Sequence, residues 1–243
     1  NRDKEKRRII NESLKEIRTY LNYLRPKVFF PAGGTYSIYG KFHKLNKYIA
    51  QPSFSQIVNK LSKSKTKIYN LIGGGSICFD NNKHVVNEKN KIMKNGFNKT
   101  FINKVKNIDY YYSNGKSNIN LTKLDGTFLS AKNNYLNVLS SKKKIKSKWD
   151  VYFKIYKNYE INEKCSINNK KSEYLKTYHL KNYNSNPKKK FKLECHIEYE
   201  LFKSLLSGKF PWNTSLSGST IMYRRSPNKY NVDMVFSLNF LRI

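Results

Sequence analysis

The feature that most constrains the fold is an apolar stripe that stops at a proline. Apolar residues recur at steps of four, three, four and three residues, the spacing of one face of an amphipathic helix. Pro26 ends this helix, and a short apolar strand, 27–30, follows at once. A helix that passes into a strand with almost no loop is typical of α/β architecture. The stripe consists of Ile10, Leu14, Ile17, Leu21 and Leu24.

The segment that follows this strand has the composition of a functional loop. Pro31 ends the apolar run, and Gly33, Gly34 and Gly40 allow backbone conformations that are closed to residues with a side chain. Strand ends in α/β folds are where sites are built. His43 is the candidate of this loop for metal ligation or acid/base chemistry, and bracing of the loop is the alternative. The polar and aromatic residues of the loop are Thr35, Tyr36, Ser37, Tyr39, Lys41, His43 and Asn46.

A second helix and strand are predicted next. Ser53 can cap a helix whose apolar face contains Phe54, Ile57, Val58 and Leu61. A strand over 67–72 then leads into three glycines, which lack the spacing of a phosphate-binding loop and favour a tight turn. Another short strand, 77–79, is expected to end at Asp80.

The predicted fold class is α/β, and α+β overall. The chain is predicted to consist of three segments. Residues 1–80 form a first α/β region, and 81–148 form a Lys- and Asn-rich, partly helical insertion. Residues 149–243 form a C-terminal α+β extension. Its strands are predicted at 149–155, where Tyr152 and Tyr156 also allow a helix, at 174–180 and 191–199 as a hairpin, and at 232–240 as a closing strand. A helix with Tyr199, Phe202, Leu205 and Leu206 on one face is expected to end at Gly208.

The net charge of +32 points to nucleic acid or another anionic partner. Lys supplies most of it, and Lys, Asn, Ile and Tyr share A/T-rich codons, so base composition of the genome is a competing explanation. The basic residues are also spread along the chain. Arg224 and Arg225 stand out because Arg is rare here, and its planar fork fits carboxylate or phosphate.

The cysteines and histidines exclude several kinds of site within these residues. The three cysteines are widely spaced, which suits a reducing cytoplasm. The four histidines lie far apart and form no H-x-H or H-x-x-x-H pair, so neither a metal site nor a complete catalytic centre is predicted in this chain. His196, beside Cys195 in an alternating strand, is interpreted as structural. No apolar stretch has the length of a membrane span.

Two motifs resemble metallo-β-lactamase-fold proteins of the sugar-nucleotide hydroxylase group, the relatives of CMP-N-acetylneuraminate and UDP-N-acetylmuramate hydroxylases. The first motif matches at Pro26, Lys27, Pro31, Gly33, Gly34, Tyr36, Gly40, Lys41, Leu45 and Asn46. The second matches at Leu205, Leu206, Gly208, Lys209, Trp212, Asn213, Gly218, Arg225, Pro227, Asn228 and Tyr230. The resemblance implies that residues 1–80 form the second half of the αββα sandwich of that fold.

The same resemblance implies a cytoplasmic enzyme, a metal-dependent hydrolase or a Rieske-type monooxygenase, acting on an anionic sugar nucleotide or phosphosugar. The divalent metal (Zn, Mn or Fe) and any Rieske 2Fe–2S cluster would lie in residues upstream of this chain, whose first residue suggests an internal start. The implied substrate-binding residues are Tyr36, Tyr39, Lys41, Asn46, Trp212, Asn213, Arg224 and Arg225. A nonspecific nucleic-acid-binding module and a structural half without activity are the alternatives.

Overall fold

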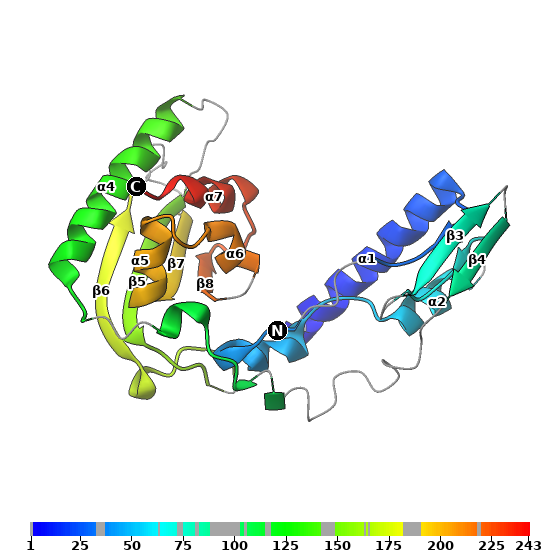
Figure 1. The fold of residues 1–243 in the computed structure, drawn as a ribbon, viewed down its shortest axis with the longest axis horizontal. Coiled ribbons are helices and arrows are strands. Elements are labelled where there is room, and N and C mark those ends of the chain that lie inside the picture. The colour runs from blue at the N-terminus through cyan, green and yellow to red at the C-terminus, as the bar shows by residue number, and fades with distance from the viewer. Residues whose placement is uncertain are drawn as a thin grey trace. The chain divides into compact units, whose positions relative to one another are not determined.

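The computed structural model is an α+β protein, which confirms the predicted class (Figure 1). By its internal contacts the chain forms two compact units, which are described separately. The first unit comprises Asn1–Ser37 with Leu45–Lys106, and the second comprises Ile38–Lys44 with Asn107–Ile243. The structure describes residues 2–32, 37–62, 64–71, 75–80, 83–87, 103–104, 106–114, 118–141, 149–162, 164, 166–181, 191–217 and 220–243.

The first unit contains the predicted helix-to-strand segment. Helix α1 spans Arg2–Leu24, and Arg25, at a φ of 47°, takes the left-handed conformation that ends it before Pro26. Strand β1 (Val28–Phe29) then pairs in parallel with β2 (Lys67–Ile68). The helix α2 (Phe54–Leu61) lies between these two strands in sequence, as a parallel connection requires.

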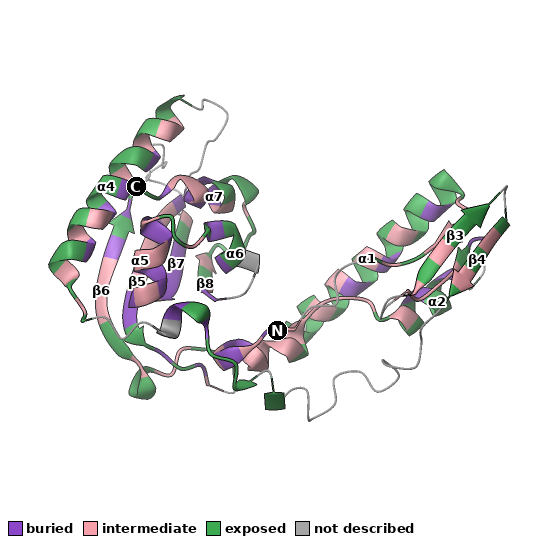
Figure 2. Cartoon of the chain, in the orientation of Figure 1, coloured by how far each residue is buried: buried purple, intermediate pink, exposed green. Residues whose placement is uncertain are grey.

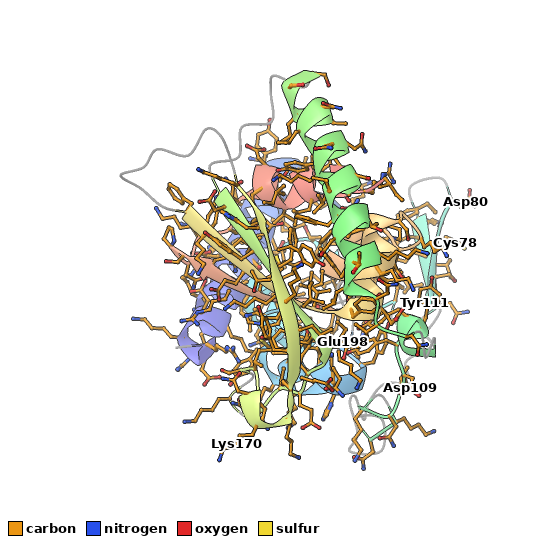
Figure 3. The ribbon with its side chains drawn as sticks, turned by 90° about the vertical axis from the view of Figure 1, so that its left-hand side faces the viewer. Cys78, Asp80, Asp109, Tyr111, Lys170 and Glu198 are labelled. Carbon is orange, nitrogen blue, oxygen red and sulfur yellow. The ribbon has the colours of Figure 1, made fainter. Side chains whose placement is uncertain are left out.

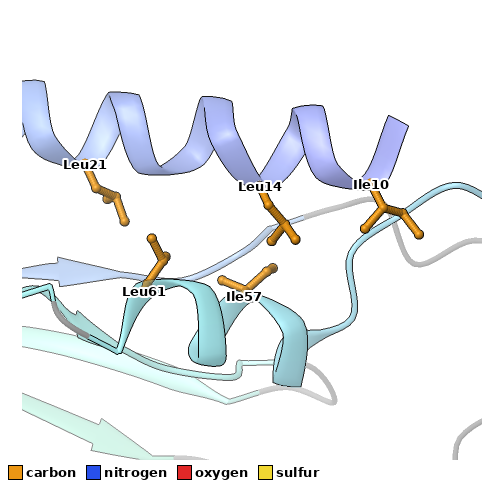
Figure 4. Close-up of a cluster of buried hydrophobic side chains, with 5 residues drawn as sticks. All are labelled: Ile10, Leu14, Leu21, Ile57 and Leu61. Carbon is orange, nitrogen blue, oxygen red and sulfur yellow. The ribbon is translucent and has the colours of Figure 1, made fainter. Parts of the chain in front are cut away.

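A small apolar core joins α1 to α2. Its buried side chains come from the predicted stripes and are drawn in Figure 4: Ile10, Leu14, Leu21, Ile57 and Leu61. The predictions for Leu24 and Val58 are wrong, because both are exposed. Leu61, the last residue of α2, faces Leu21 (Figure 4), and Leu24 follows Leu21 by three residues, at the end of α1.

Ser53 caps α2 as predicted. The Ser53 Oγ accepts a hydrogen bond from the Gln56 backbone N–H, and the Gln56 side chain accepts one from the Ser53 N–H, which completes a capping box. Strand β3 (Ser76–Asp80) confirms the predicted strand and its end at Asp80. It forms an antiparallel hairpin with β4 (Lys83–Asn87), which was not predicted because that segment contains only two apolar residues.

A four-stranded mixed sheet organises the second unit. Its strands are β5 (Trp149–Asn158), β6 (Glu173–Leu180), β7 (Phe191–Glu198) and β8 (Met222–Ser226), in the order β6-β5-β7-β8. Strand β5 is antiparallel to β6 and parallel to β7, and β8 is antiparallel to β7.

The predicted hairpin between 174–180 and 191–199 is wrong. Both strands exist, but β5 lies between them. Strand β5 is buried at every second position from Trp149 to Ile155, and a hairpin of its two neighbours would leave it at an edge with unpaired backbone groups. The alternation in the sequence identifies the strands, whereas the burial of β5 decides which of them are neighbours.

One face of this sheet is covered by helices. Helix α4 (Leu121–Ser141) lies within the segment predicted as a partly helical insertion, and its contacts place it in the second unit. Helices α5 (Tyr199–Leu206) and α6 (Trp212–Ser217) pack on the same face, and α5 ends before Gly208, as predicted. Figure 2 shows buried residues concentrated on β5, β7 and α5. The segment boundaries predicted at 80 and 148 stay predictions.

The predicted closing strand at 232–240 is wrong. This segment forms α7 (Val232–Ser237) and the short 3-10 helix η4 (Leu238–Phe240). The Asn231 side chain accepts a hydrogen bond from the Met234 N–H and so caps α7. Met234, Leu238 and Leu241 are buried at steps of four and three residues, so the helical spacing prevails over the alternation.

The remaining elements are three short 3-10 helices: η1 (Gly40–Tyr48), η2 (Tyr111–Asn114) and η3 (Asn169–Lys171). Among the residues that the structure describes, no helix combines the length and the apolar character needed to cross a membrane.

We expect Phe202→Ala to lower the free energy of unfolding of the second unit by about 3–5 kcal/mol, because the substitution leaves a cavity in a fully buried core. Urea denaturation followed by tryptophan fluorescence measures this unit, since Trp149 and Trp212 both belong to it. Leu129→Ala, at an exposed position of α4, is the matched control and should change stability by less than about 0.5 kcal/mol. Equal effects of the two substitutions would contradict the assignment of this core.

Candidate nucleic-acid interface

The face of the C-terminal sheet opposite the helices is polar. Successive strand residues point to opposite sides of the sheet. The residues that alternate with the helix-facing residues of β5 and β7 therefore share this face with their cross-strand neighbours. We call it the polar face. Its residues are Asp150, Tyr152, Lys154, Tyr156, Thr177, His179, Lys192, Glu194, His196 and Arg224.

A charge cluster lies at the centre of the polar face. The Glu194 carboxylate, which is buried, lies 2.7 Å from Lys192 Nζ and 3.3 Å from Lys154 Nζ. Burial raises the pKa of Glu194, but the hydrogen bonds and charges of the two lysines outweigh this effect and hold the pKa below its usual value. The other carboxylate oxygen, Oε2, is buried and has no hydrogen-bond partner among the described residues. It is an unpaired acceptor inside the charge cluster.

His196 extends this cluster. Its Nδ1 lies 3.0 Å from the Tyr156 hydroxyl, and its Nε2 lies 3.9 Å from Glu194 Oε2. Burial, assisted by the charge of Lys154, lowers the pKa of His196 to about 4, so the ring is neutral at pH 7. Burial also raises the pKa of Tyr156, which therefore keeps its proton. A proton donated by Tyr156 to Nδ1 leaves the imidazole N–H on Nε2, on the side of Glu194.

Aromatic rings form a second feature of the polar face. Tyr152 and His179 are stacked, with ring centroids 4.3 Å apart and planes 6° apart. Lys192 Nζ lies 4.7 Å from the centroid of Tyr152. His179 and Lys192 are exposed, and Tyr152 is half-buried. Flat rings beside an ammonium group are the combination that holds nucleobases next to phosphates.

A hollow of about 330 Å³ adjoins the charge cluster at the β5–β6 side. Lys154 and Tyr156 contribute to it from β5, and Tyr174 and Thr177 from β6, with their hydroxyl groups 2.8 Å apart. Its wall is completed by Asn169 and Ser172. The residues around the hollow carry hydroxyl and amide groups, and Lys154 is the one cation among these described residues.

The two arginines predicted from the sequence lie on β8. Arg224 is exposed on the polar face, in register with Glu194. Arg225 points to the opposite side of the strand, where its guanidinium lies 5.7 Å from the centroid of the Tyr230 ring. The pair therefore does not bind one anion jointly, and only Arg224 belongs to the polar face.

The part of the predicted functional loop that belongs to the second unit, Ile38–Lys44, makes contacts inside that unit. Lys41 Nζ lies 2.6 Å from Glu198 Oε1, and 3.6 Å from the centroid of Tyr159. Both charged side chains are mostly buried, with Glu198 at the end of β7 (Figure 3). Burial lowers the pKa of Lys41, and the charge of Glu198 acts in the opposite direction. Lys41 is thus engaged in an internal ion pair.

Neighbours of Lys41 also make internal contacts. The Tyr39 ring packs at a tilt against Tyr110, with centroids 5.2 Å apart, and the Tyr110 hydroxyl donates a hydrogen bond of 2.8 Å to the Tyr39 carbonyl oxygen. Gly40 has a φ of 60°, and a Cβ there would lie 2.7 Å from Tyr110 Cζ, so this position requires glycine. His43 Nδ1 lies 2.9 Å from the Gly40 carbonyl oxygen, a contact that braces the loop.

The other predicted site residues are dispersed. Asn46 belongs to the first unit. Trp212 is buried and its Nε1 donates a hydrogen bond of 3.0 Å to the Leu241 carbonyl oxygen, whereas Asn213 beside it is exposed. Gly33, Gly34 and Tyr36 lie outside the described residues. Their proposed contacts with substrate stay predictions.

Sequence reasoning did not find the central residues of the polar face: Lys154, Tyr156, Glu194 and His196. The sequence predicts a structural role for His196, and it assigns no role to the polar residues of β5. The available signal was the alternation of apolar and polar residues along β5. A strand whose apolar side is covered by helices has a second, polar side, and the residues on that side are candidates for binding. Over the described part of the chain, no three His, Cys, Asp or Glu residues cluster in a way that could hold a metal ion.

No protein-family model, curated protein or solved structure matches this chain. The resemblance to sugar-nucleotide hydroxylases, with its upstream metal centre, therefore stays a prediction.

We expect the stability of the protein to fall as the pH drops from about 6.5 to about 4 because of His196. In this window the unfolded chain binds a proton that the folded imidazole, with its pKa lowered to about 4, does not bind. The contribution of His196 to the free energy of unfolding is therefore fully present above the window and is lost as the pH falls through it. The loss approaches about 3 kcal/mol. Urea denaturation at several pH values should show a shallower decline for His196→Gln, and the same decline in both proteins would contradict the assignment.

Proposed function

We propose that the second unit binds single-stranded nucleic acid across the polar face. The observation that carries this proposal is the Tyr152–His179 stack with Lys192 beside it, on an accessible sheet surface. Nucleobases stack on such rings without regard to sequence, and neighbouring cations contact the phosphates.

The charge of the second unit supports this proposal. The unit contains 27 Lys and Arg against 10 Asp and Glu. The lysine triplets 142–144 and 188–190 lie outside the described residues, but the strands that follow them, β5 and β7, begin side by side with Trp149 paired to Phe191. Lysine-rich sequence therefore leads into the end of the sheet that carries Tyr152 and Lys192. An excess of cations of this size favours polyanions through counterion release.

Glu194 has a positioning role in this proposal. Its carboxylate fixes the ammonium groups of Lys154 and Lys192, both of which keep part of their surface exposed. The polar face thus combines stacking rings with positioned cations within one sheet.

We expect Tyr152→Ala to weaken binding of a labelled oligo(U) of about 20 nucleotides by roughly fivefold to a hundredfold, because one stacking platform is lost. Fluorescence anisotropy at low salt measures the affinity. Tyr23→Ala, at a strongly exposed tyrosine of α1, is the matched control and should bind as the wild type does. Absence of any binding at low salt would refute the proposed function. Equal losses of affinity in both variants would show that the polar face is not the binding surface.

We expect Arg224→Gln to weaken binding and to reduce the slope of log affinity against log salt by about 0.7, the contribution of one phosphate contact to a single strand. Titrations between about 50 and 200 mM salt give this slope. Lys123→Gln removes the same charge from exposed helix α4 on the covered side of the sheet. If the two variants behave alike, the positive charge acts diffusely and Arg224 makes no specific contact.

A further inference from the structure

A second cavity, of about 330 Å³, lies in the second unit at the junction of α5, α6 and the C-terminal segment. Four aromatic side chains contribute to its lining: Phe210, Trp212, Phe236 and Phe240. We propose that this cavity binds a small planar aromatic molecule that carries one anionic group. The proposal is independent of nucleic-acid binding on the polar face.

The aromatic wall is held in place by its own contacts. The Trp212 ring is buried, and its Nε1–H is bound to the Leu241 carbonyl oxygen. Phe236 and Phe240 meet edge to face, with centroids 5.9 Å apart. Phe210 is stacked with Tyr111 at 5.6 Å. Rings that are already fixed lose little conformational freedom when a flat ligand packs against them.

The polar groups of the cavity favour an anion. Arg242 is the only charged residue among the described residues that line it, and no acidic partner of its guanidinium is found in the described part of the chain. The Arg242 backbone is fixed at both sides, since its N–H donates to the Phe240 carbonyl and its own carbonyl accepts from Asn134. A guanidinium without a carboxylate beside it binds a carboxylate, sulfonate or phosphate through two parallel hydrogen bonds.

Two amides and a glycine complete the cavity. Asn213 and Asn239 both line it, and the Asn239 Nδ2 already donates to the Phe236 carbonyl oxygen, which leaves the Asn239 carbonyl oxygen as an acceptor. Gly208, at a φ of 70°, contributes no side chain, and a Cβ there would lie within contact of the Arg242 stem. The volume falls within the range of about 300–1,000 Å³ that small-molecule sites occupy.

The test uses Trp212 as the reporter. The chain has two tryptophans, so Trp149→Phe leaves Trp212 as the only one. The full-length Trp149→Phe protein is titrated with para-nitrobenzoate, a flat anion that quenches tryptophan emission, and with the neutral para-nitrobenzamide of the same shape. We expect saturable quenching by the anion and an affinity for the amide that is at least about tenfold weaker, because one charge-assisted contact is missing.

Arg242→Met in the same background should reduce the affinity for the anion to that for the amide. Lys123→Met, at an exposed position of α4, removes an equal charge outside the cavity and should leave the affinity within about twofold. Circular dichroism confirms that each variant is folded. Quenching that rises linearly without saturation, or an affinity for the anion that survives Arg242→Met in a folded protein, would overturn the proposal.

Discussion

The packing of Phe153 among rings from three helices is the contact on which the rest of the second unit depends. Its centroid lies 5.2 Å from that of Phe202, 5.8 Å from Trp212 and 6.2 Å from Phe128, and the residue is fully buried. Because side chains alternate along β5, fixing Phe153 toward the helices also fixes Tyr152 and Lys154 on the other side. The direction of the Phe153 side chain therefore decides which residues of β5 lie on the covered face and which lie on the polar face. A shift of β5 by one residue would exchange the two sets.

The polar face has its own energetic requirement. A buried carboxylate is unfavourable unless it is paired, and Glu194 has two lysines within ion-pair distance. The neutral His196 and the Tyr156 hydroxyl satisfy each other beside it. One acceptor, Glu194 Oε2, is left without a partner, so the cluster is complete in charge but not in hydrogen bonds. Such an unpaired buried acceptor lowers the stability of the protein.

Local patterns predicted the elements well where one period dominates. The stripe of α1, the Ser53 cap, the alternation from Trp149 to Ile155 and the end of α5 before Gly208 all reappear in the structure. The segment from Val232 to Phe240 fits both periods, and its Asn231 cap and buried Leu241 lie outside the alternating residues. The order of the strands in the sheet could not be predicted from the sequence, since alternation defines which side of a strand is buried and not which strands lie beside it.

Lys41 shows why the candidate site was harder to predict than the fold. A lysine on a glycine-rich loop after a strand has the composition of a substrate contact, and the sequence around it contains no acid that would suggest otherwise. Its partner, Glu198, lies at the end of a distant strand, and the pair forms only when that strand is assembled. Of the residues that face outward, Arg224 stands out because Arg is rare, whereas Tyr152 and Lys192 are unremarkable in a chain rich in tyrosine and lysine. Their common side of the sheet, which depends on the pairing of three strands, distinguishes them from the other basic and aromatic residues.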